Sequence, residues 1–347
     1  MKTKKDQVSR RKFIGTSALA AAGLGLAGQR LWAGPAILKH YNKPDSFIEG
    51  VRLGVITYSF RSMEDQSAEA TLQYVLDSGI SEIELMGDPA ESFAGKPDNP
   101  VDRRAYFGLM RAQRAGELTS DQEKEMAEMR AQMEAYNKQV AEWRGKTSME
   151  PFEKLKKMYA DKGVTIYAFK PNAFGMNNTD VEIDWGIKAA KALGASHVTL
   201  EHPDNDDHTA KLGWMGANHG IFIGYHGHEQ QTPTFWDTAL KQSTFNSLNL
   251  DLGHYVAAGN AAPLDIIRDK YLRIRSMHVK DRQTPANGKG NVAWGQGDTP
   301  ITEALQLMKK NAYEFPATIE LEYDIPEGSN AVTEVRKCVE YCRESLS

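Results

Sequence analysis

Short apolar runs alternate with longer polar and amphipathic stretches over most of the sequence. Each of eight such runs is followed by a polar loop and then by a segment in which apolar residues recur at helical spacing. The runs occupy residues 53–60, 81–87, 164–170, 196–203, 221–228, 248–254, 274–281 and 317–323. Repeated strand and helix units of this kind form a parallel sheet covered by helices, and eight units close into a barrel. The pattern predicts an α/β fold, a (β/α)8 or TIM barrel.

The repeat is interrupted after the second predicted strand, where residues 97–150 form a predicted helical insertion. Within it, residues 119–146 carry apolar side chains at every third or fourth position, which predicts one long helix. Ser120 and Glu123 have the spacing of a capping box at its start. We expect a surface helix that packs one apolar stripe on the barrel; a lid or a dimer contact is the alternative.

The N-terminal 33 residues have the features of an export signal. Arg10 and Arg11 precede an Ala- and Gly-rich apolar stretch that is short for a membrane span, and small residues follow at Ala33 and Gly34. This order is typical of a twin-arginine signal peptide with cleavage near Ala33. We therefore expect residues 34–347 to be one exported, periplasmic barrel domain.

The charge balance argues against a nucleic-acid partner. The chain has 42 Lys and Arg against 46 Asp and Glu, and residues 1–33 hold seven of the former and one of the latter. The remaining 35 basic and 45 acidic residues leave a net charge near −10, which repels phosphate backbones. No later segment is apolar enough to cross a bilayer, so no stable membrane insertion is expected.

Ionisable side chains gather at the ends of five consecutive predicted strands. The active site of a TIM barrel lies at the carboxyl ends of its strands. Strand alternation turns His278 and Lys280 inward, and likewise Glu320 and Glu322. The full set is Glu201, His226, His228, Asp251, His254, His278, Lys280, Glu320 and Glu322. So many ionisable groups at one barrel mouth are costly unless a cation or a substrate uses them.

The ligand chemistry at this mouth favours a catalytic divalent metal. Carboxylates and imidazoles without thiolates suit Mn²⁺, Zn²⁺, Co²⁺ or Fe²⁺, and an incomplete protein shell leaves coordination positions for substrate oxygens. An ion of this kind stabilises the enediolate that forms when a proton leaves the carbon beside a carbonyl.

These motifs resemble the xylose-isomerase-like, sugar phosphate isomerase/epimerase superfamily of TIM barrels. Inosose dehydratases, hydroxypyruvate isomerases and endonuclease-IV-type enzymes belong to the same superfamily. The resemblance implies one metal ligand from each of strands five to eight, at His226, Asp251, His278 and Glu320. Many members have Glu where this chain has His226, and Glu201 on the neighbouring strand could supply that carboxylate. We therefore expect Glu201, His226 and Glu320 to be catalytic, with His226 either a ligand or an acid/base.

Five further residues are expected to contact the substrate. The resemblance assigns His254, in a "DxxH" motif, to substrate or to a second metal, and His228 to substrate or to support of the site. Lys280 and Arg282 could hold substrate oxygens, or form salt bridges with Asp281 or Glu322. In the Gly-rich loop 287–298, Trp294 offers a flat face for a sugar ring, as Trp236 does after strand five, although either could be packing.

The expected function is that of a metal-dependent isomerase or epimerase that abstracts a proton next to the carbonyl of a keto sugar or inosose. The alternative with the same site is a lyase or dehydratase, for example one acting on a 3-keto-glycoside. A noncatalytic sugar-binding protein is the alternative from another class. The expected partner is a small sugar, and a homo-oligomer is left open.

Overall fold

The computed structural model describes residues 43–347, and the export-signal prediction lies outside these residues. Within them, eight parallel strands form a closed barrel in chain order. Pairing of the first barrel strand with the last, through Leu53 and Ala317 among others, closes it. The strands are β2 (Val51–Ile56), β3 (Glu82–Met86), β4 (Thr165–Lys170), β5 (His197–Glu201), β6 (Phe222–His226), β7 (Asn246–Asp251), β8 (Ile274–Val279) and β9 (Ala317–Ile319). The TIM-barrel prediction is confirmed.

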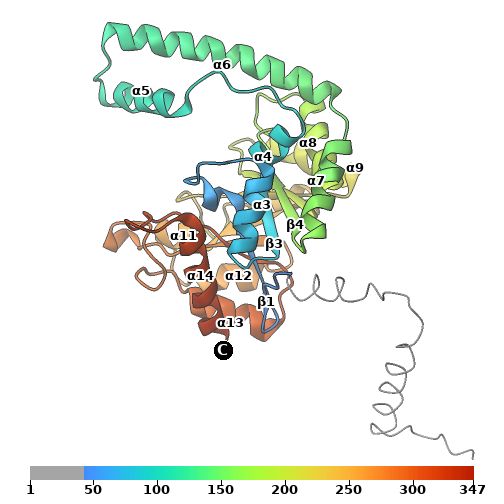
Figure 1. Cartoon of the computed structure of the whole chain (residues 1–347). Coiled ribbons are helices and arrows are strands. Elements are labelled where there is room, and N and C mark those ends of the chain that lie inside the picture. The colour runs from blue at the N-terminus through green and yellow to red at the C-terminus, as the bar shows by residue number, and fades with distance from the viewer. Residues whose placement is uncertain (1–42) are drawn as a thin grey trace, which may run out of the picture. The chain divides into compact units, whose positions relative to one another are not determined.

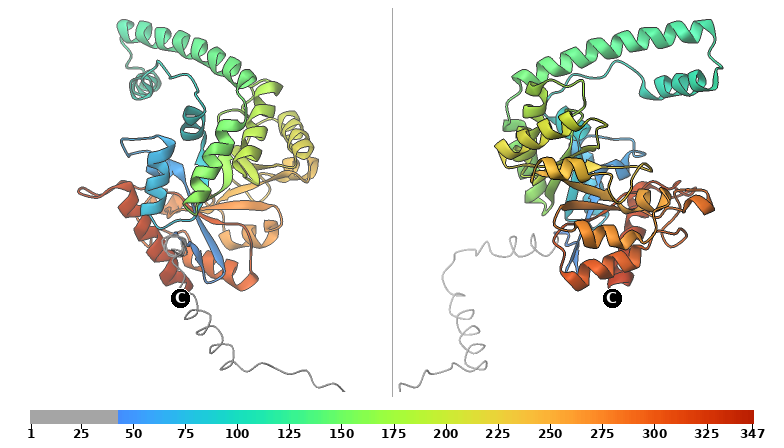
Figure 2. Two further views of the ribbon diagram at one scale, coloured as in Figure 1. Left: turned by 45° about the vertical axis from the view of Figure 1, so that its right-hand side comes forward. Right: turned by 180° about the vertical axis from the view of Figure 1, so that it is seen from behind.

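Helices surround the barrel (Figures 1 and 2). The α-helices are α3 (Ala68–Asp77), α4 (Gly87–Phe93), α5 (Arg103–Ala115), α6 (Ser120–Lys146), α7 (Glu150–Asp161), α8 (Asp180–Leu193), α9 (Asp206–His219), α10 (Asp237–Gln242), α11 (Leu252–Ala257), α12 (Pro263–Lys270), α13 (Ile301–Asn311) and α14 (Ala331–Leu346). Two short 3-10 helices, η1 (Thr57–Phe60) and η2 (Pro285–Asn287), lie in loops, and β1 (Phe47–Ile48) pairs antiparallel with β2. None of the described helices is long and apolar enough to cross a membrane.

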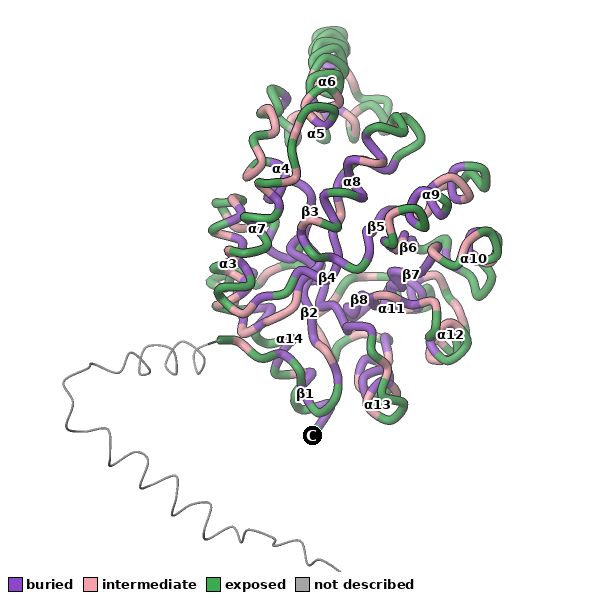
Figure 3. The backbone as a smooth tube through the Cα atoms, turned by 90° about the vertical axis from the view of Figure 1, so that its right-hand side faces the viewer, coloured by how far each residue is buried: buried purple, intermediate pink, exposed green. Residues whose placement is uncertain are grey.

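Burial follows the strand alternation. The outward residues Met277 and Val279 belong to the apolar core between strands and helices, as Ile83 and Leu85 do on β3. Figure 3 shows the buried strands at the centre and exposed residues on the outer helix faces. Inside the barrel the side chains are polar: Tyr167 Oη lies 2.7 Å from Thr318 Oγ1. A Cβ on Gly54 would lie 2.6 Å from that Tyr167 oxygen, so β2 needs glycine there.

The insertion contains the predicted long helix, α6, which runs beside α5 beyond the barrel (Figures 1 and 2). The predicted capping box is wrong by one residue: Thr119 is the N-cap, and its hydroxyl and Gln122 exchange the two capping hydrogen bonds. Thr119 and Gln122 have the same motif spacing, and Thr119 has the extended backbone that a cap requires.

The base of α6 is fixed to the barrel by buried charges. Arg144 is 5% exposed and forms ion pairs with Glu91 of α4 and Glu182 of α8, at 3.2 and 3.0 Å. Along the helix, Met126 and Val140 are buried, so the predicted apolar stripe is present. The expectation that the whole stripe packs on the barrel is wrong, because among the described residues only the C-terminal end of α6 contacts the barrel helices and the rest runs beside α5. A cleft of about 750 Å³ beside this base is lined by residues of α4, α6 and the loop after β4, and by none of the predicted site residues.

Candidate metal and active site

Asp251 lies at the centre of the ionisable residues at the barrel mouth. It ends β7 and is the N-cap of α11, where its Oδ1 accepts a 2.7 Å hydrogen bond from the backbone N–H of His254. The cap orients the carboxylate so that Oδ2 faces the other predicted ligands. His226 Nε2 lies 3.8 Å from Oδ2, and His278 Nδ1 and His254 Nε2 each lie 3.9 Å from it.

Lys280 links the acidic residue at the end of β7 to the two that follow β9. Its Nζ lies 2.9 Å from Asp251 Oδ2 and donates 2.7 Å hydrogen bonds to Glu320 and Glu322. Burial disfavours its charge, yet Asp251 and the two glutamates raise the pKa of Lys280 above its ordinary value. The predicted alternative of a Lys280 salt bridge to Glu322 is therefore observed.

Glu320 is the more deeply placed of the two glutamates that follow β9. Its side chain is 7% exposed, against 21% for Glu322, and its Oε2 accepts hydrogen bonds from both His278 Nδ1 and Lys280. Burial alone would raise the pKa of Glu320, but Lys280 and His278 hold it well below the usual range. Glu322 contacts Lys280 and lies 3.9 Å from His254 Nε2.

Two polar residues beneath the mouth, Glu84 and Asn249, are not among the sequence-predicted site residues. Glu84 on β3 accepts a 2.9 Å hydrogen bond from His278 Nε2, and Asn249 on β7 accepts one of 2.8 Å from His226 Nδ1. Both are fully buried. The signal was present in the sequence, because Glu84 lies between Ile83 and Leu85, and the same alternation that turns those residues outward turns Glu84 into the barrel.

His278 is charged in this arrangement because carboxylates lie at both ring nitrogens. Burial lowers the pKa of His278, but the charges of Glu320 and Glu84 outweigh burial and raise it to about 10. The pKa of His226 is instead lowered well below its ordinary value by burial and by the nearby positive charges of Lys170 and His278. The two imidazoles thus differ in charge although both lie against Asp251.

His254 and Arg282 form the side of the site next to the loop after β8. Arg282 donates a 2.6 Å hydrogen bond to His254 Nδ1 and another of 2.6 Å to Glu229. Burial, with the charge of Lys280, lowers the pKa of His254 to about 3, so the ring is neutral. Because Nδ1 accepts from Arg282, the hydrogen of the neutral ring is on Nε2, which faces Asp251 and Glu322.

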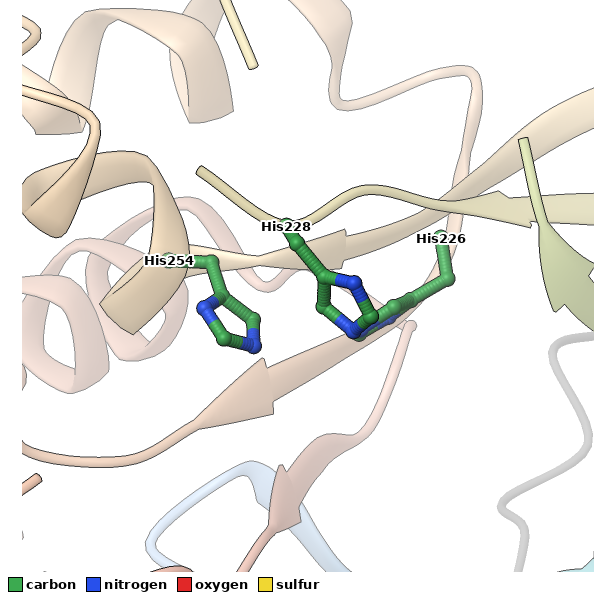
Figure 4. Close-up of side chains that lie close together, drawn as sticks. All are labelled: His226, His228 and His254. Atoms are coloured by element: carbon green, nitrogen blue, oxygen red, sulfur yellow. The ribbon is translucent and has the colours of Figure 1, made fainter. Parts of the chain in front are cut away.

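Glu201 and His228 lie at the exposed rim. Glu201 Oε1 accepts a 3.0 Å hydrogen bond from Lys170, and its Oε2 lies 3.6 Å from His228 Nε2. Both side chains are about half exposed. The rings of His226, His228 and His254 face one another, with the His228 and His254 centroids 4.6 Å apart (Figure 4). Glu201 is thus near the histidines, but among the described residues no hydrogen bond or ion pair joins it to Asp251 or His278.

The two predicted tryptophans lie in packing contacts. Trp236 is fully buried in the apolar core, which agrees with the packing alternative. Trp294 is partly buried, and its ring contacts Tyr341 of α14 edge-on, with centroids 5.7 Å apart. The loop that carries Trp294 is held by Asp281, which accepts hydrogen bonds from the backbone N–H groups of Gly295 and Gly297.

The buried carboxylate oxygen of Asp251 fits a metal ion. Asp251 Oδ2 is fully buried and has no hydrogen-bond donor, because Lys280 approaches it as an ion pair without hydrogen-bond geometry. Burial, together with the nearby charge of Glu320, raises the pKa of Asp251 even though Lys280 and His278 oppose this shift. Two groups of three residues bring potential ligand atoms within 4.8 Å of one another. One group is His226, Asp251 and His278, and the other is His226, His228 and His254. Ligands of a tetrahedral ion are separated by roughly 3.3–3.6 Å, close to the distances here.

A model of one protein family matches most of this chain. Residues 131–344 match the family model described as "Xylose isomerase-like TIM barrel". The chain belongs to this xylose isomerase-like family. None of the curated protein sequences matches it significantly.

Solved structures of this xylose isomerase-like fold resemble the chain over most of its length. A sugar phosphate isomerase/epimerase of Parabacteroides distasonis is 16% identical, with a TM-score of 0.55 over 86% of this chain and 95% of that one. The probable 3-DHS dehydratase AsbF of Bacillus anthracis is 15% identical, with a TM-score of 0.56 over 84% and 98%. The IolI protein with a bound zinc atom is 14% identical, with a TM-score of 0.53 over 86% and 99%. At these identities the likeness shows the fold.

Proposed function

We propose that this xylose isomerase-like protein is a metal-dependent sugar isomerase or epimerase that moves a proton next to the carbonyl of a keto sugar or inosose. The observation that carries the proposal is the convergence of His226 Nε2 and His278 Nδ1 on the donor-free Oδ2 of Asp251. The acidic surplus there suits a divalent cation such as Zn²⁺, Mn²⁺, Co²⁺ or Fe²⁺. The similarity to the IolI protein, which binds a zinc atom, and to the sugar phosphate isomerase/epimerase of Parabacteroides distasonis supports it.

His226, Asp251, His278 and Glu320 would hold the ion. It would supply positive charge that stabilises the oxyanion formed as the proton leaves the carbon. The buried positions of these four residues, each at most 6% exposed, keep water from the ligand side of the site.

The rim residues would bind the substrate and move the proton. Glu201 is the carboxylate closest to open solvent in the cluster, and its ion pair with Lys170 orients it. We assign it the role of base. The Nε2–H of His254 lies beside Asp251 and Glu322 and would donate a hydrogen bond to a substrate oxygen, and Lys280 would hold the neighbouring carboxylates in place. His228, 3.6 Å from Glu201, would accept or return the proton.

Expulsion of a substituent after the same proton transfer would give a lyase. The dehydratase in the comparison supports this as the second candidate, because it shares the fold over 84% of this chain. The two outcomes differ only in the fate of the group on the carbon next to the carbanion, and one assay separates them.

The test is metal analysis of the purified protein, followed by incubation with keto sugars, inososes and 3-keto-glycosides in D₂O. NMR would show deuterium at the carbon next to the carbonyl for an isomerase or epimerase, and an eliminated product for a lyase. Asp251→Asn keeps the shape of the side chain but removes its charge, and should lose both metal and exchange. Full exchange after chelation would refute the metal mechanism, and metal-dependent binding without turnover would favour the noncatalytic alternative.

A further inference from the structure

Glu84 is a carboxylate buried inside the barrel, one layer below the predicted ligands. Its side chain accepts hydrogen bonds from three strands: Oε1 from the Thr199 hydroxyl at 2.6 Å, and Oε2 from Asn249 Nδ2 at 3.1 Å and His278 Nε2 at 2.9 Å. A buried carboxylate can only accept hydrogen bonds, so each of these neighbours has to present a hydrogen to it. Glu84 thereby fixes the orientation of every group that contacts it.

The first consequence concerns Asn249. Since its NH₂ group faces Glu84, and also donates to Ser276 Oγ at 2.7 Å, its carbonyl oxygen faces the opposite way. That oxygen lies 2.8 Å from His226 Nδ1. An amide oxygen accepts only, so the hydrogen of a neutral His226 has to be on Nδ1. The lone pair of the ring is then on Nε2, the nitrogen that faces Asp251.

The second consequence concerns His278, which contacts Glu84 directly. Its Nε2 has to carry a hydrogen for Glu84, so the nitrogen available to a metal is Nδ1. This nitrogen lies 3.9 Å from Asp251 Oδ2 and 3.1 Å from Glu320 Oε2. The two rings therefore present different nitrogen atoms, Nε2 of His226 and Nδ1 of His278, to the same carboxylate oxygen.

We infer that Glu84 is the positioning residue of the metal centre: it selects the ligating nitrogen of His278 directly and that of His226 through Asn249. It acts from below the site, and among the described residues no hydrogen bond joins it to Asp251 or Glu320. The inference rests on the proposed function only in assigning the two rings to a metal, because the hydrogen positions follow from the protein's own hydrogen bonds. Residues that orient ligating histidines change metal affinity by about 10–100-fold when they are removed.

The unmodified protein provides the first test. In protein with ¹⁵N-labelled histidines, long-range ¹H–¹⁵N NMR spectra distinguish a hydrogen on Nδ1 from one on Nε2, with assignment by single His→Gln variants. We expect His226 to carry its hydrogen on Nδ1 with and without zinc, and zinc-loaded His278 to carry it on Nε2. A hydrogen on Nε2 of His226 would overturn the inference. If zinc fails to bind, the metal part of the proposed function is refuted, while the His226 signal of the metal-free protein still decides the hydrogen position.

Two variants and a control separate the direct path from the path through Asn249. Glu84→Gln keeps the shape of the side chain but can donate as well as accept hydrogen bonds. In this variant His226 should carry its hydrogen partly on Nδ1 and partly on Nε2, and zinc affinity should fall about 10–100-fold. Asn249→Leu should mix the His226 positions and leave Nε2–H of His278 intact. Thr199→Val removes only the hydrogen bond to Oε1 and should change zinc affinity less than about threefold. Wild-type spectra and affinity in Glu84→Gln would refute the role of Glu84.

Discussion

Lys280 offers the sharpest test of the charge balance at the site. Its ammonium is shared by Asp251, Glu320 and Glu322 at 2.7–2.9 Å, and its side chain is 2% exposed. Lys280→Met keeps most of the side-chain volume but leaves these carboxylates without their common cation. Removal of one partner from a buried ion pair costs about 3–5 kcal/mol. For a unit of about 300 residues, whose unfolding entropy is roughly 0.6 kcal/mol/K, this corresponds to a fall in Tm of about 5–8 °C.

The assay compares metal-free and zinc-loaded proteins by thermal and denaturant unfolding. A ligand at 100 times its Kd stabilises a protein by about 2.7 kcal/mol. We expect zinc to raise the Tm of Lys280→Met more than that of the wild type, because the dication replaces the missing charge. Lys211→Met is the matched control: Lys211 pairs with Asp180 at the protein surface, outside the site, and such pairs contribute about 0–1 kcal/mol. The reasoning would be refuted if metal-free Lys280→Met lost less than about 1 kcal/mol of unfolding free energy relative to the wild type. It would also be refuted if zinc raised the Tm of Lys280→Met and of the wild type equally.

Three further predictions use different measurements. Glu320→Gln should lose bound metal and proton exchange, whereas Glu322→Gln should keep the metal with reduced activity, because Glu322 is more exposed. If metal analysis shows the reverse, Glu322 is the ligand and the site lies one pleat further out. The pKa of His278 is raised from 6.5 to about 10, so its contribution to metal-free stability is complete below pH 6.5 and lost as the pH rises through 10. The urea midpoint of the wild type should therefore fall over that pH range. The midpoint of His278→Gln should change less with pH. We also expect Arg10→Lys with Arg11→Lys to leave the protein in the cytoplasm on cell fractionation, and unchanged export would contradict the twin-arginine prediction.

The fold could be predicted from the sequence because the barrel repeats one local pattern eight times. Each apolar run identified a strand within a few residues, and strand alternation alone predicts that His278 and Lys280 point into the barrel, as they do. The convergence of residues from β6, β7 and β8 also followed, since the carboxyl ends of parallel strands meet at one mouth.

The partners inside the site could not be predicted in the same way. Alternation gives the side of the sheet to which Lys280 points, but the choice between substrate, Asp281 and Glu322 depends on distances across three strands. In the structure Lys280 pairs with three carboxylates, whereas Asp281 accepts hydrogen bonds from the backbone of the Gly-rich loop. Likewise Glu84 is separated from His278 by 194 residues, and no local pattern connects them.

The charges of these long-range partners explain why the site would take a cation and still fold without one. Four carboxylates, Glu84, Asp251, Glu320 and Glu322, are within hydrogen-bond or ion-pair distance of two positive groups, Lys280 and the His278 imidazolium. The protein alone is thus short of two positive charges at its centre, a deficit that a bound divalent ion would reduce. Since a ligating His278 has to release its Nδ1 hydrogen, binding of the ion would exchange one positive charge for two. The Lys280 ammonium and the His278 imidazolium therefore reduce the repulsion among the buried carboxylates of the metal-free barrel, and the remaining negative charge would favour binding of a cation.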